Sequence, residues 1–298
     1  MRLIIAFKRQ NNYERMMILM RRITNELITN FKERLIEEEK SPATVDKYVR
    51  DVAGFKDWCN NARLCKALVL EYKQMAVEKY APASVNAIIS SLNSFFAFMN
   101  WYDMRIKALK IQRQIFAERD KELTKAEYER LLTASKRKNN ERLYYLMQTI
   151  CSSGIRVSEL SSITVEAAKN QRANINCKGK MRVVILPREL CKMLISYAKR
   201  QKITSGAVFV TRTGKPLDRS TIWKMMKALC ESAGVDKSKV FPHNLRHLFA
   251  RTYYSIQKDI VRLADILGHT SVNTTRIYTM EAGDIHRMQI QKLGLLRQ

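Results

Sequence analysis

The sequence contains few of the residues that build several common classes of protein. Its 298 residues include only four histidines, five prolines and nine glycines. So little proline and glycine excludes a collagen-like or low-complexity chain, and a histidine-rich metal site is not expected. The six cysteines are scattered and form no Cys-x-x-Cys pair. This pattern favours free thiols in a reducing cytoplasm over a disulfide scaffold. We therefore expect a cytoplasmic protein that holds no metal.

Long apolar runs and acidic residues are also scarce. The longest apolar runs, such as Leu3–Phe7 and Met16–Met20, fall far short of the roughly 20 residues that a membrane span needs. Only 28 Asp and Glu stand against 54 Lys and Arg, so the formal net charge is +26. This excess points to a polyanionic partner, either nucleic acid or an anionic membrane surface. With 46% hydrophobic residues the chain can still bury one large core or two ordinary ones.

The charge divides the chain into two unequal parts. Residues 21–106 carry a net charge of +2, whereas residues 120–298 carry +18. Residues 107–119 add +3, show no strong period and are predicted to be a basic interdomain linker. The domain predicted over residues 23–106 is a small bundle of four helices. Its helices are expected over 23–39, 43–60 (after Ser41-Pro42), 64–78 and from Ala81-Pro82 onwards.

Residues 1–22 form an N-terminal extension whose role the sequence leaves open. They are either an additional basic helix or a stretch outside the translated protein, since Met16, Met17 and Met20 offer later starts. A peripheral membrane protein would need a basic amphipathic helix, and only residues 1–20 offer a weak candidate.

The second domain, residues 120–298, is predicted to be mostly α-helical with a small β island, a mixed α/β domain. Thr124 and Glu127 form a capping box ahead of its first helix. Ala173–Asn176 and Met181–Leu186 flank Cys177–Lys180, which is the pattern of a β-hairpin with a basic tip. Further elements are expected as a short strand at Val208–Val210 and as helices at Ser220–Ala233, Leu245–Ile256 and Ile260–Leu267.

Two motifs of this domain place arginines at helix starts. Arg156 follows a helix-breaking Gly154, and Glu159 can orient its guanidinium to hold a phosphate bidentately. His243 and Arg246 lie one helical turn apart on one face. If both side chains face outward, this helix N-terminus is a ready anion site. Taken alone, each motif also has an ordinary explanation, as an Arg156–Glu159 ion pair or as a capping histidine beside a surface arginine.

Three further residues are candidates for proton transfer or nucleophilic attack. Lys178 at the hairpin tip can reach into a site and donate a proton. His269 follows Gly268, which fits the glycine that caps a helix C-terminus. Tyr278 can be a covalent nucleophile where cations lower the cost of ionising it. Each of these also has a structural interpretation, as a solvated turn lysine, a plain helix end and a packing tyrosine.

Together the motifs resemble a known family. In the order GIRVSEL, CKGKMR, HNLRH, LGH and TTRIYT, they look like those of the tyrosine recombinases, which comprise phage integrases, Xer-type recombinases and integrases of conjugative transposons. The nine residues from His269 to Tyr278 agree with the usual family spacing. The resemblance covers residues 120–280 by motif, and residues 23–106 look more loosely like the family's SAM-like core-binding domain. The sequence departs slightly in having Ser153-Gly154-Ile155 for the commoner Thr-Gly-Leu, and a shorter loop after Lys178-Gly179, which makes Lys180 a rival candidate for the lysine.

The resemblance implies a site-specific recombinase that cleaves and rejoins duplex DNA through a 3′-phosphotyrosyl intermediate, without ATP or metal. The sequence has no GxxxxGK[ST] loop, in agreement with that expectation. The implied catalytic residues are Arg156, Lys178, His243, Arg246, His269 and the nucleophile Tyr278, with Glu159 in a supporting position.

Each of these residues has an implied role at the scissile phosphate. Arg156 and Arg246 would clamp the two non-bridging oxygens as charge develops on them. His269 would donate a hydrogen bond to one of those oxygens. His243 would help to accept the proton of the tyrosine, and Lys178 would protonate the departing 5′ oxygen.

The resemblance also implies partners. The two domains would close around duplex DNA, and binding should depend strongly on salt. The apolar tail, residues 281–298, is expected to dock on a neighbouring subunit of a four-subunit synapse, or else on its own domain. Accessory DNA-bending proteins are a further class of partner.

Two other functions compete with recombination. A type IB topoisomerase shares the chemistry but reseals the strand without exchanging partners. A non-catalytic DNA-binding regulator would explain the charge but not the complete set of site residues. Integration, excision, dimer resolution and inversion use one active site, and the sequence does not separate them.

Overall fold

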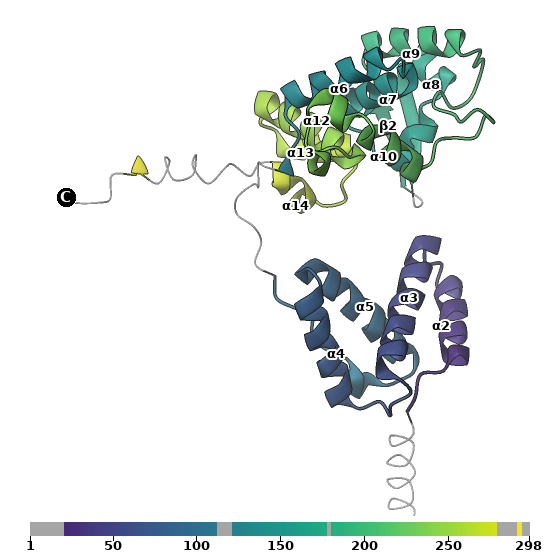
Figure 1. Cartoon of the computed structure of the whole chain (residues 1–298), viewed down its shortest axis with the longest axis vertical. Helices are drawn as coiled ribbons and strands as arrows, with labels where there is room; N and C mark the ends of the chain where they lie inside the picture. Colours follow the sequence, from purple (N-terminus) through teal and green to yellow (C-terminus); the bar gives the residue numbers. More distant parts are fainter. Residues whose placement is uncertain (1–20, 112–120, 178–179, 279–290, 294–298) are drawn as a thin grey trace, which may run out of the picture. The chain divides into compact units, whose positions relative to one another are not determined.

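A computed structural model describes residues 21–111, 121–177, 180–278 and 291–293, with only the backbone of Cys177 and Lys180. The chain divides into two compact units, Met1–Arg113 and Gln114–Gln298 (Figure 1). Most of the predicted extension 1–22 and of the tail 281–298 lies outside the described residues, as does most of the linker 107–119. Within the described ranges no helix is long and apolar enough to cross a membrane.

The first unit is built from helices, as predicted. Prolines occupy the first turn of two of them, and the Thr24 hydroxyl caps another by accepting from the Leu27 backbone N–H at 3.2 Å. Their apolar faces meet in an aromatic core in which Phe31, Phe55 and Phe95 are almost fully buried. The elements are α2 (Asn25–Glu37), α3 (Pro42–Cys59), α4 (Lys66–Lys79), α5 (Pro82–Phe98) and a 3₁₀ turn, η1 (Tyr102–Met104).

Two asparagines of α5 hold the segment that follows the first unit's helices. The Asn93 amide donates to the Ile106 carbonyl at 2.8 Å and accepts from its N–H at 2.9 Å. Asn86 makes the same pair of bonds with Leu109, at 3.0 and 2.7 Å. Ile106 is buried in the first core, and Leu109 packs against it. The first unit therefore includes residues at least to Leu109, slightly beyond the boundary expected from the charge pattern.

The second unit is mostly helical around one β-hairpin. The capping box predicted at its first helix is present, with the Thr124 N–H donating to Glu127 Oε2 at 2.8 Å and the Glu127 N–H to Thr124 Oγ1 at 3.2 Å. Its elements are α6 (Lys125–Arg137), α7 (Glu141–Ser153), η3 (Val157–Ser162), α8 (Val165–Lys169), β1 (Arg172–Cys177), β2 (Lys180–Ile185), α9 (Arg188–Arg200), α10 (Arg219–Lys227), α11 (Cys230–Ala233), η4 (Lys237–Lys239), α12 (Pro242–Gln257), α13 (Ile260–Leu267), α14 (Val272–Thr275) and η5 (Arg276–Tyr278).

The hairpin has the predicted antiparallel pairing. Ala173 lies opposite Val184 and Cys177 opposite Lys180. Side chains alternate between the two faces of a strand, so Val184 is buried while Val183 and Ile185 are exposed. The same alternation directs Arg182 toward the interior of the unit.

Two predicted elements of the second unit were wrong. Val208–Val210 is not a strand, because only isolated bridges join Ala207 to Thr164 and Val210 to Pro216. Its apolar run reflects burial of Val208 and Phe209 in the core. The helix predicted over Ser220–Ala233 breaks after α10, where the Leu229 N–H bonds three residues back, to the Met226 carbonyl.

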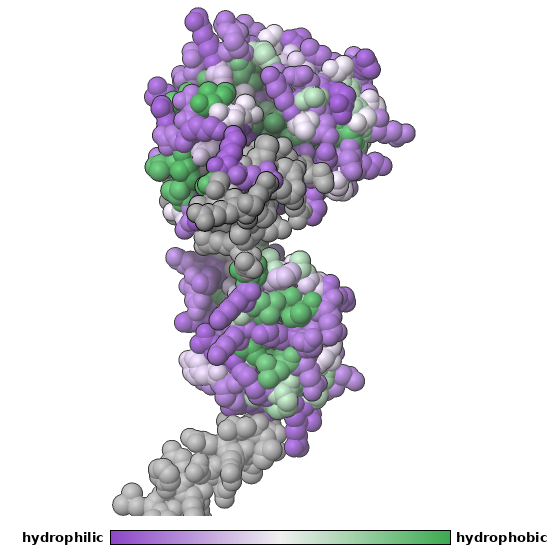
Figure 2. Space-filling model, turned by 90° about the vertical axis from the view of Figure 1, so that its left-hand side faces the viewer, coloured by the Kyte–Doolittle hydropathy of each residue, from purple (hydrophilic) through white to green (hydrophobic). Residues whose placement is uncertain are grey.

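Most of the surface drawn in Figure 2 is hydrophilic, with separate hydrophobic patches on both units. A surface rich in charged side chains agrees with the composition.

Candidate active site

Helix α12 carries Arg246 into the interior of the second unit. Pro242 stands in the first turn of the helix, since its fixed φ suits that position. Leu245 and Arg246 both face inward, and Arg246 is only 1% exposed. The expectation of an outward-facing arginine was therefore wrong. The Arg246 guanidinium donates to the carbonyls of Gly154 and Leu267, at 2.6 and 2.7 Å.

The third partner of Arg246 is a histidine. Arg246 Nη2 lies 3.0 Å from His269 Nε2. Among the described residues no carboxylate lies within salt-bridge distance of Arg246, so its partners there are neutral. Burial and the nearby Arg156 lower the pKa of Arg246 to about 10, and the residue still carries its charge at neutral pH.

Arg156 reaches the same place from the end of α7. Gly154 ends that helix at φ +65°, and a Cβ there would meet the Phe249 ring at 2.5 Å, so the position requires glycine. Arg156 is the residue before η3, and its guanidinium donates to Glu159 Oε1 at 3.0 Å and to the Gly268 carbonyl at 3.2 Å. Its side chain is 35% exposed, so Arg156 combines fixed contacts with an open side.

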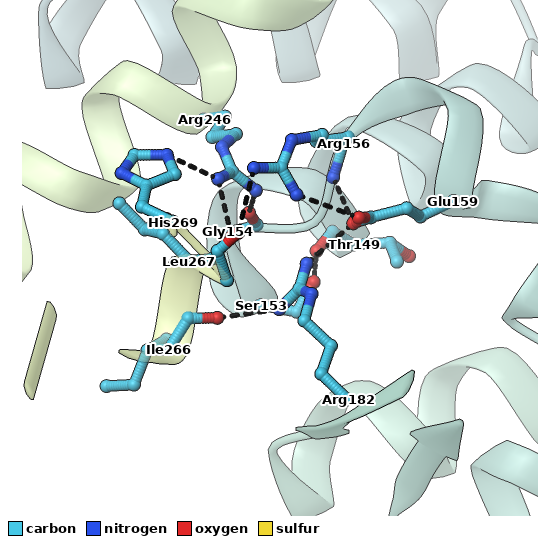
Figure 3. Close-up of polar contacts among 11 residues, drawn as sticks. Thr149, Ser153, Gly154, Arg156, Glu159, Arg182, Arg246, Ile266, Leu267 and His269 are labelled. Atoms are coloured by element: carbon cyan, nitrogen blue, oxygen red, sulfur yellow. Dashed lines mark hydrogen bonds and ion pairs between the residues drawn. The ribbon is translucent and has the colours of Figure 1, made fainter. Parts of the chain in front are cut away.

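A third arginine, Arg182 of β2, joins this cluster (Figure 3). It donates to Glu159 Oε2 at 2.6 Å and to the Ile266 carbonyl at 2.7 Å. Sequence reasoning missed it, although a basic residue on the buried face of a predicted strand was a visible signal. Glu159, with a side chain only 2% exposed, thus pairs with two arginines.

His269 follows directly on the glycine that ends α13. Gly268 has φ +62°, as its predicted position after a helix C-terminus requires. Since an arginine can only donate, His269 Nε2 accepts from Arg246, and Nδ1–H donates to Thr275 Oγ1 at 2.9 Å. Burial and the surrounding arginines lower the pKa of His269 to about 4, so the free protein holds it neutral.

Tyr278 lies in η5 and is 5% exposed. Its ring stacks near His269, with centroids 6.4 Å apart, and meets His247 edge to face at 5.1 Å. Burial raises the pKa of Tyr278, while Arg246, which hydrogen-bonds to it, and the charge of Arg156 oppose that rise. The hydroxyl is therefore protonated in the free protein and needs a base to ionise.

Two histidines of α12 complete the surroundings of Tyr278. His243 is exposed, and its ring lies 4.3 Å from that of His247. Although the residue is exposed, its ring loses water where it packs against His247, and this desolvation, followed by the charge of Arg246, lowers the pKa of His243. Burial likewise lowers the pKa of His247 to about 4. Sequence reasoning assigned His247 no role, yet its Nε2 is buried without a hydrogen-bond partner among the described residues.

The two candidates for the predicted lysine, Lys178 and Lys180, belong to the hairpin segment of the sequence. Lys178 lies outside the described residues, and Lys180, the rival candidate, is described only by its backbone in β2, opposite Cys177. Across the described ranges no three His, Cys, Asp or Glu side chains are grouped so as to hold a metal ion.

Three guanidiniums, from Arg156, Arg182 and Arg246, therefore gather in one cluster, and its single carboxylate, that of Glu159, pairs with Arg156 and Arg182. The cluster has a formal charge of +2 beside a buried tyrosine. Such an excess of positive charge can stabilise an anion, as positioned cations do in phosphoryl transfer.

Comparison with known proteins identifies the family. The chain belongs to the phage integrase family, whose model matches residues 121–283, and the model of the phage integrase N-terminal SAM-like domain matches residues 28–102. The tyrosine recombinase XerA of Thermococcus kodakarensis is 29% identical over 282 residues, which cover 91% of this chain and 96% of the relative. The tyrosine recombinase XerD of Xanthomonas campestris is 28% identical, covering 87% and 88%. The protein is accordingly a tyrosine recombinase that carries out site-specific DNA recombination.

Solved structures support the fold. A crystal structure of XerA recombinase aligns with a TM-score of 0.50 at 29% identity and covers 93% of this chain and all of that one. A lambda integrase dimer bound to a COC′ core site aligns with a TM-score of 0.71 at 16% identity, covering 87% and 96%. The predicted fold class, mostly α with a small sheet and a SAM-like N-terminal domain, is confirmed.

Proposed function

We propose that Tyr278 is the nucleophile of this recombinase and that Arg156, Arg246 and His269 bind the scissile phosphate of duplex DNA. The observation that carries the proposal is the state of Arg246. It is charged and 1% exposed, and within the described residues only neutral groups contact it. A buried charge without a counterion is costly, and the cost is offset when an anion enters. A phosphodiester, whose oxygens gain charge during attack, fits this need.

The proton transfers follow from the states of the side chains. Attack forms a bond between the Tyr278 oxygen and phosphorus and breaks the bond to the 5′ oxygen, leaving a 3′-phosphotyrosyl enzyme. The tyrosine proton passes to a neutral base, for which His243 is suited because its lowered pKa leaves it unprotonated at neutral pH. Lys178, or Lys180 in its place, donates a proton to the leaving 5′ oxygen. The phosphotyrosine retains the bond energy, so a 5′-hydroxyl of the partner strand can reverse the step.

His269 must change its hydrogen bonding to take its role. In the free protein its Nε2 accepts from Arg246 and has no proton to give. Its pKa of about 4 results from burial and from the positive charge of Arg246, Arg156 and Arg182. A bound phosphate anion opposes that charge and raises the pKa, so that a protonated His269 donates to a non-bridging oxygen.

The partners we propose are duplex DNA and three further copies of the chain. Solved structures with this fold include a XerH recombinase bound to its difH substrate and a lambda integrase tetramer bound to a Holliday junction. The net charge of +26 supports DNA as the partner. We further propose that the apolar tail 281–298 docks on a neighbouring copy, and that accessory DNA-bending proteins assist assembly.

The proposal is tested by trapping the covalent intermediate. Wild type, Tyr278→Phe and the control Tyr253→Phe are incubated with a nicked suicide duplex carrying the candidate recombination site. Tyr253 is a partly buried tyrosine of the same small cluster, so the control removes a hydroxyl without touching the proposed nucleophile. We expect a covalent protein–DNA band with wild type and Tyr253→Phe and none with Tyr278→Phe. An adduct in Tyr278→Phe, or none with wild type on DNA that it binds, would overturn the proposal.

A second assay addresses partner exchange. Joining of the cleaved strand to a different duplex is expected of a recombinase. Resealing only of the original strand would instead indicate a topoisomerase-like reaction.

A further inference from the structure

Three arginines of the site share one helix end. The carbonyls of Ile266, Leu267 and Gly268, at the C-terminus of α13, each accept from a different guanidinium. Carbonyls at a helix C-terminus lack partners within the helix and stand at the negative end of its dipole, so they suit cations. Arg246 takes the Leu267 carbonyl, and Arg156 takes that of Gly268. The third arginine, Arg182, takes the Ile266 carbonyl but has no role in the chemistry described above.

Arg182 is also tied to Arg156 through Glu159. The two arginines use different oxygens of one carboxylate, Arg182 at 2.6 Å and Arg156 at 3.0 Å. Glu159 Oε2 in addition accepts the Arg156 backbone N–H at 2.8 Å. A carboxylate with a side chain only 2% exposed needs such bonds to offset the cost of its burial, and they fix its position. Without Arg182, one of its oxygens loses a charged partner, and its hold on Arg156 loosens.

The side chain of Arg182 also packs closely against Gly268. A Cβ built on Gly268 would lie 2.5 Å from Arg182 Cδ and 2.6 Å from Nε, so the side chain runs directly over the glycine. Its Nε is buried without a hydrogen-bond partner among the described residues. The side chain is therefore held by contacts on the α13 terminus and on Glu159, as Figure 3 shows.

We propose that Arg182 is a positioning residue, which fixes Arg156 against the scissile phosphate through their shared bonds to Glu159 and the α13 terminus. Arg182 itself need not touch DNA. This inference rests on the proposed role of Arg156. It predicts that loss of Arg182 mimics a partial loss of Arg156: DNA binding persists while cleavage slows.

The test compares single-turnover cleavage of the suicide duplex at saturating protein. The variants are Arg182→Gln, Arg182→Lys and the control Arg172→Gln, which removes the same charge from an exposed position of the paired strand. We expect Arg182→Gln to slow cleavage by about 10- to 100-fold, as small misplacements in active sites do. Its DNA affinity should stay within about threefold of that of Arg172→Gln, because only one charge is lost. Arg182→Lys should fall between, since an ammonium keeps the charge but not the fork of donors.

A second substrate separates positioning from a general structural effect. Replacing the scissile phosphate by a methylphosphonate removes the charge that Arg156 would neutralise. On this substrate Arg182→Gln should slow cleavage, relative to wild type, by a smaller factor than on the natural phosphate. Arg156→Ala should show the same reduction of its effect. An equal defect on both substrates would mean a merely structural role and would overturn the inference. So would wild-type cleavage rates in Arg182→Gln.

If Arg182→Gln folds poorly, Arg182→Lys, which keeps the charge, carries the comparison, and a double variant tests the link through Glu159. With Glu159→Gln already present, the charged link through the carboxylate is lost, so adding Arg182→Gln should slow cleavage further by less than about threefold. Independent effects that multiply would contradict the inference. The proposed function fails separately, if Arg156→Ala cleaves as wild type does or if wild type forms no adduct.

Discussion

The close approach of Arg182 to Gly268 predicts that an alanine at position 268 destabilises the second unit. In Gly268→Ala the new methyl group would meet Arg182 Cδ at 2.5 Å, and the backbone would keep a φ of +62°. Gly234 is a matched control, because it has φ +59° but no neighbouring atom within 4 Å of the place that a Cβ would occupy. The strain of an alanine in this left-handed region, about 1 kcal/mol, is common to both variants. Their difference therefore isolates the contact with Arg182.

That contact is costly to relieve because the end of Arg182 is fixed. If the Arg182 side chain moves away from the new methyl group, its guanidinium loses the hydrogen bonds to Glu159 and to the Ile266 carbonyl, at 2.6 and 2.7 Å. Charged hydrogen bonds are worth about 1.5–3 kcal/mol each, so we expect Gly268→Ala to lose about 4 kcal/mol in total and Gly234→Ala about 1 kcal/mol. For a unit of this size, 1 kcal/mol corresponds to about 2–4 °C in Tm. Gly268→Ala should therefore melt about 6–12 °C below Gly234→Ala.

Thermal unfolding of the second unit can be followed by tryptophan fluorescence. The protein has three tryptophans, and only Trp223 lies in the second unit. A background with Trp58→Phe and Trp101→Phe therefore reports that unit alone. Equal Tm values for the two glycine variants would refute the reasoning. So would a Gly268→Ala variant whose extra loss of Tm persists after Arg182→Ala has removed the clashing side chain.

Three further predictions follow from the site. First, folding stability should fall by about 2 kcal/mol for each of His247 and His269 when the pH drops from 7 to 5. Their pKa is about 4 in the folded protein, below the value in the unfolded chain. Over this pH range the unfolded chain therefore binds more protons than the folded protein and is stabilised relative to it. Urea unfolding of His269→Gln at both pH values should show a smaller fall, and an unchanged fall would refute the assignment. Second, Arg246→Lys should cleave about 100-fold more slowly at saturating DNA, since a compact ammonium lacks the planar spread of donors with which this guanidinium reaches its three acceptors; a wild-type single-turnover rate would contradict this. Third, gel-shift affinity for duplex DNA should fall by about 10³-fold between 50 and 200 mM salt, as for six to ten phosphate contacts; a flat profile would argue against phosphate-dominated binding.

The elements of the fold were largely predictable from the sequence. Prolines at helix starts, the Thr124–Glu127 capping box and the apolar periods are local signals, and local signals set α3, α5 and α6 to within a few residues. The alternation in β2 was equally readable. Where local patterns are ambiguous, prediction was wrong: the buried run Val208–Val210 forms no strand, since burial alone does not distinguish a strand from an irregular segment.

The motif residues were predictable, but their arrangement was decided by the tertiary structure. Arg246 was expected to face solvent and is buried, because the carbonyls it needs belong to Gly154 and Leu267 on other helices. Arg156 and Gly268 are 112 residues apart in the chain, and no sequence period relates them. Arg182 was missed for the same reason, since its importance comes from the α13 terminus and from Glu159. Composition and motif order predicted a DNA partner and the candidate side chains, whereas the convergence of three guanidiniums on one helix end arises only when distant segments pack together.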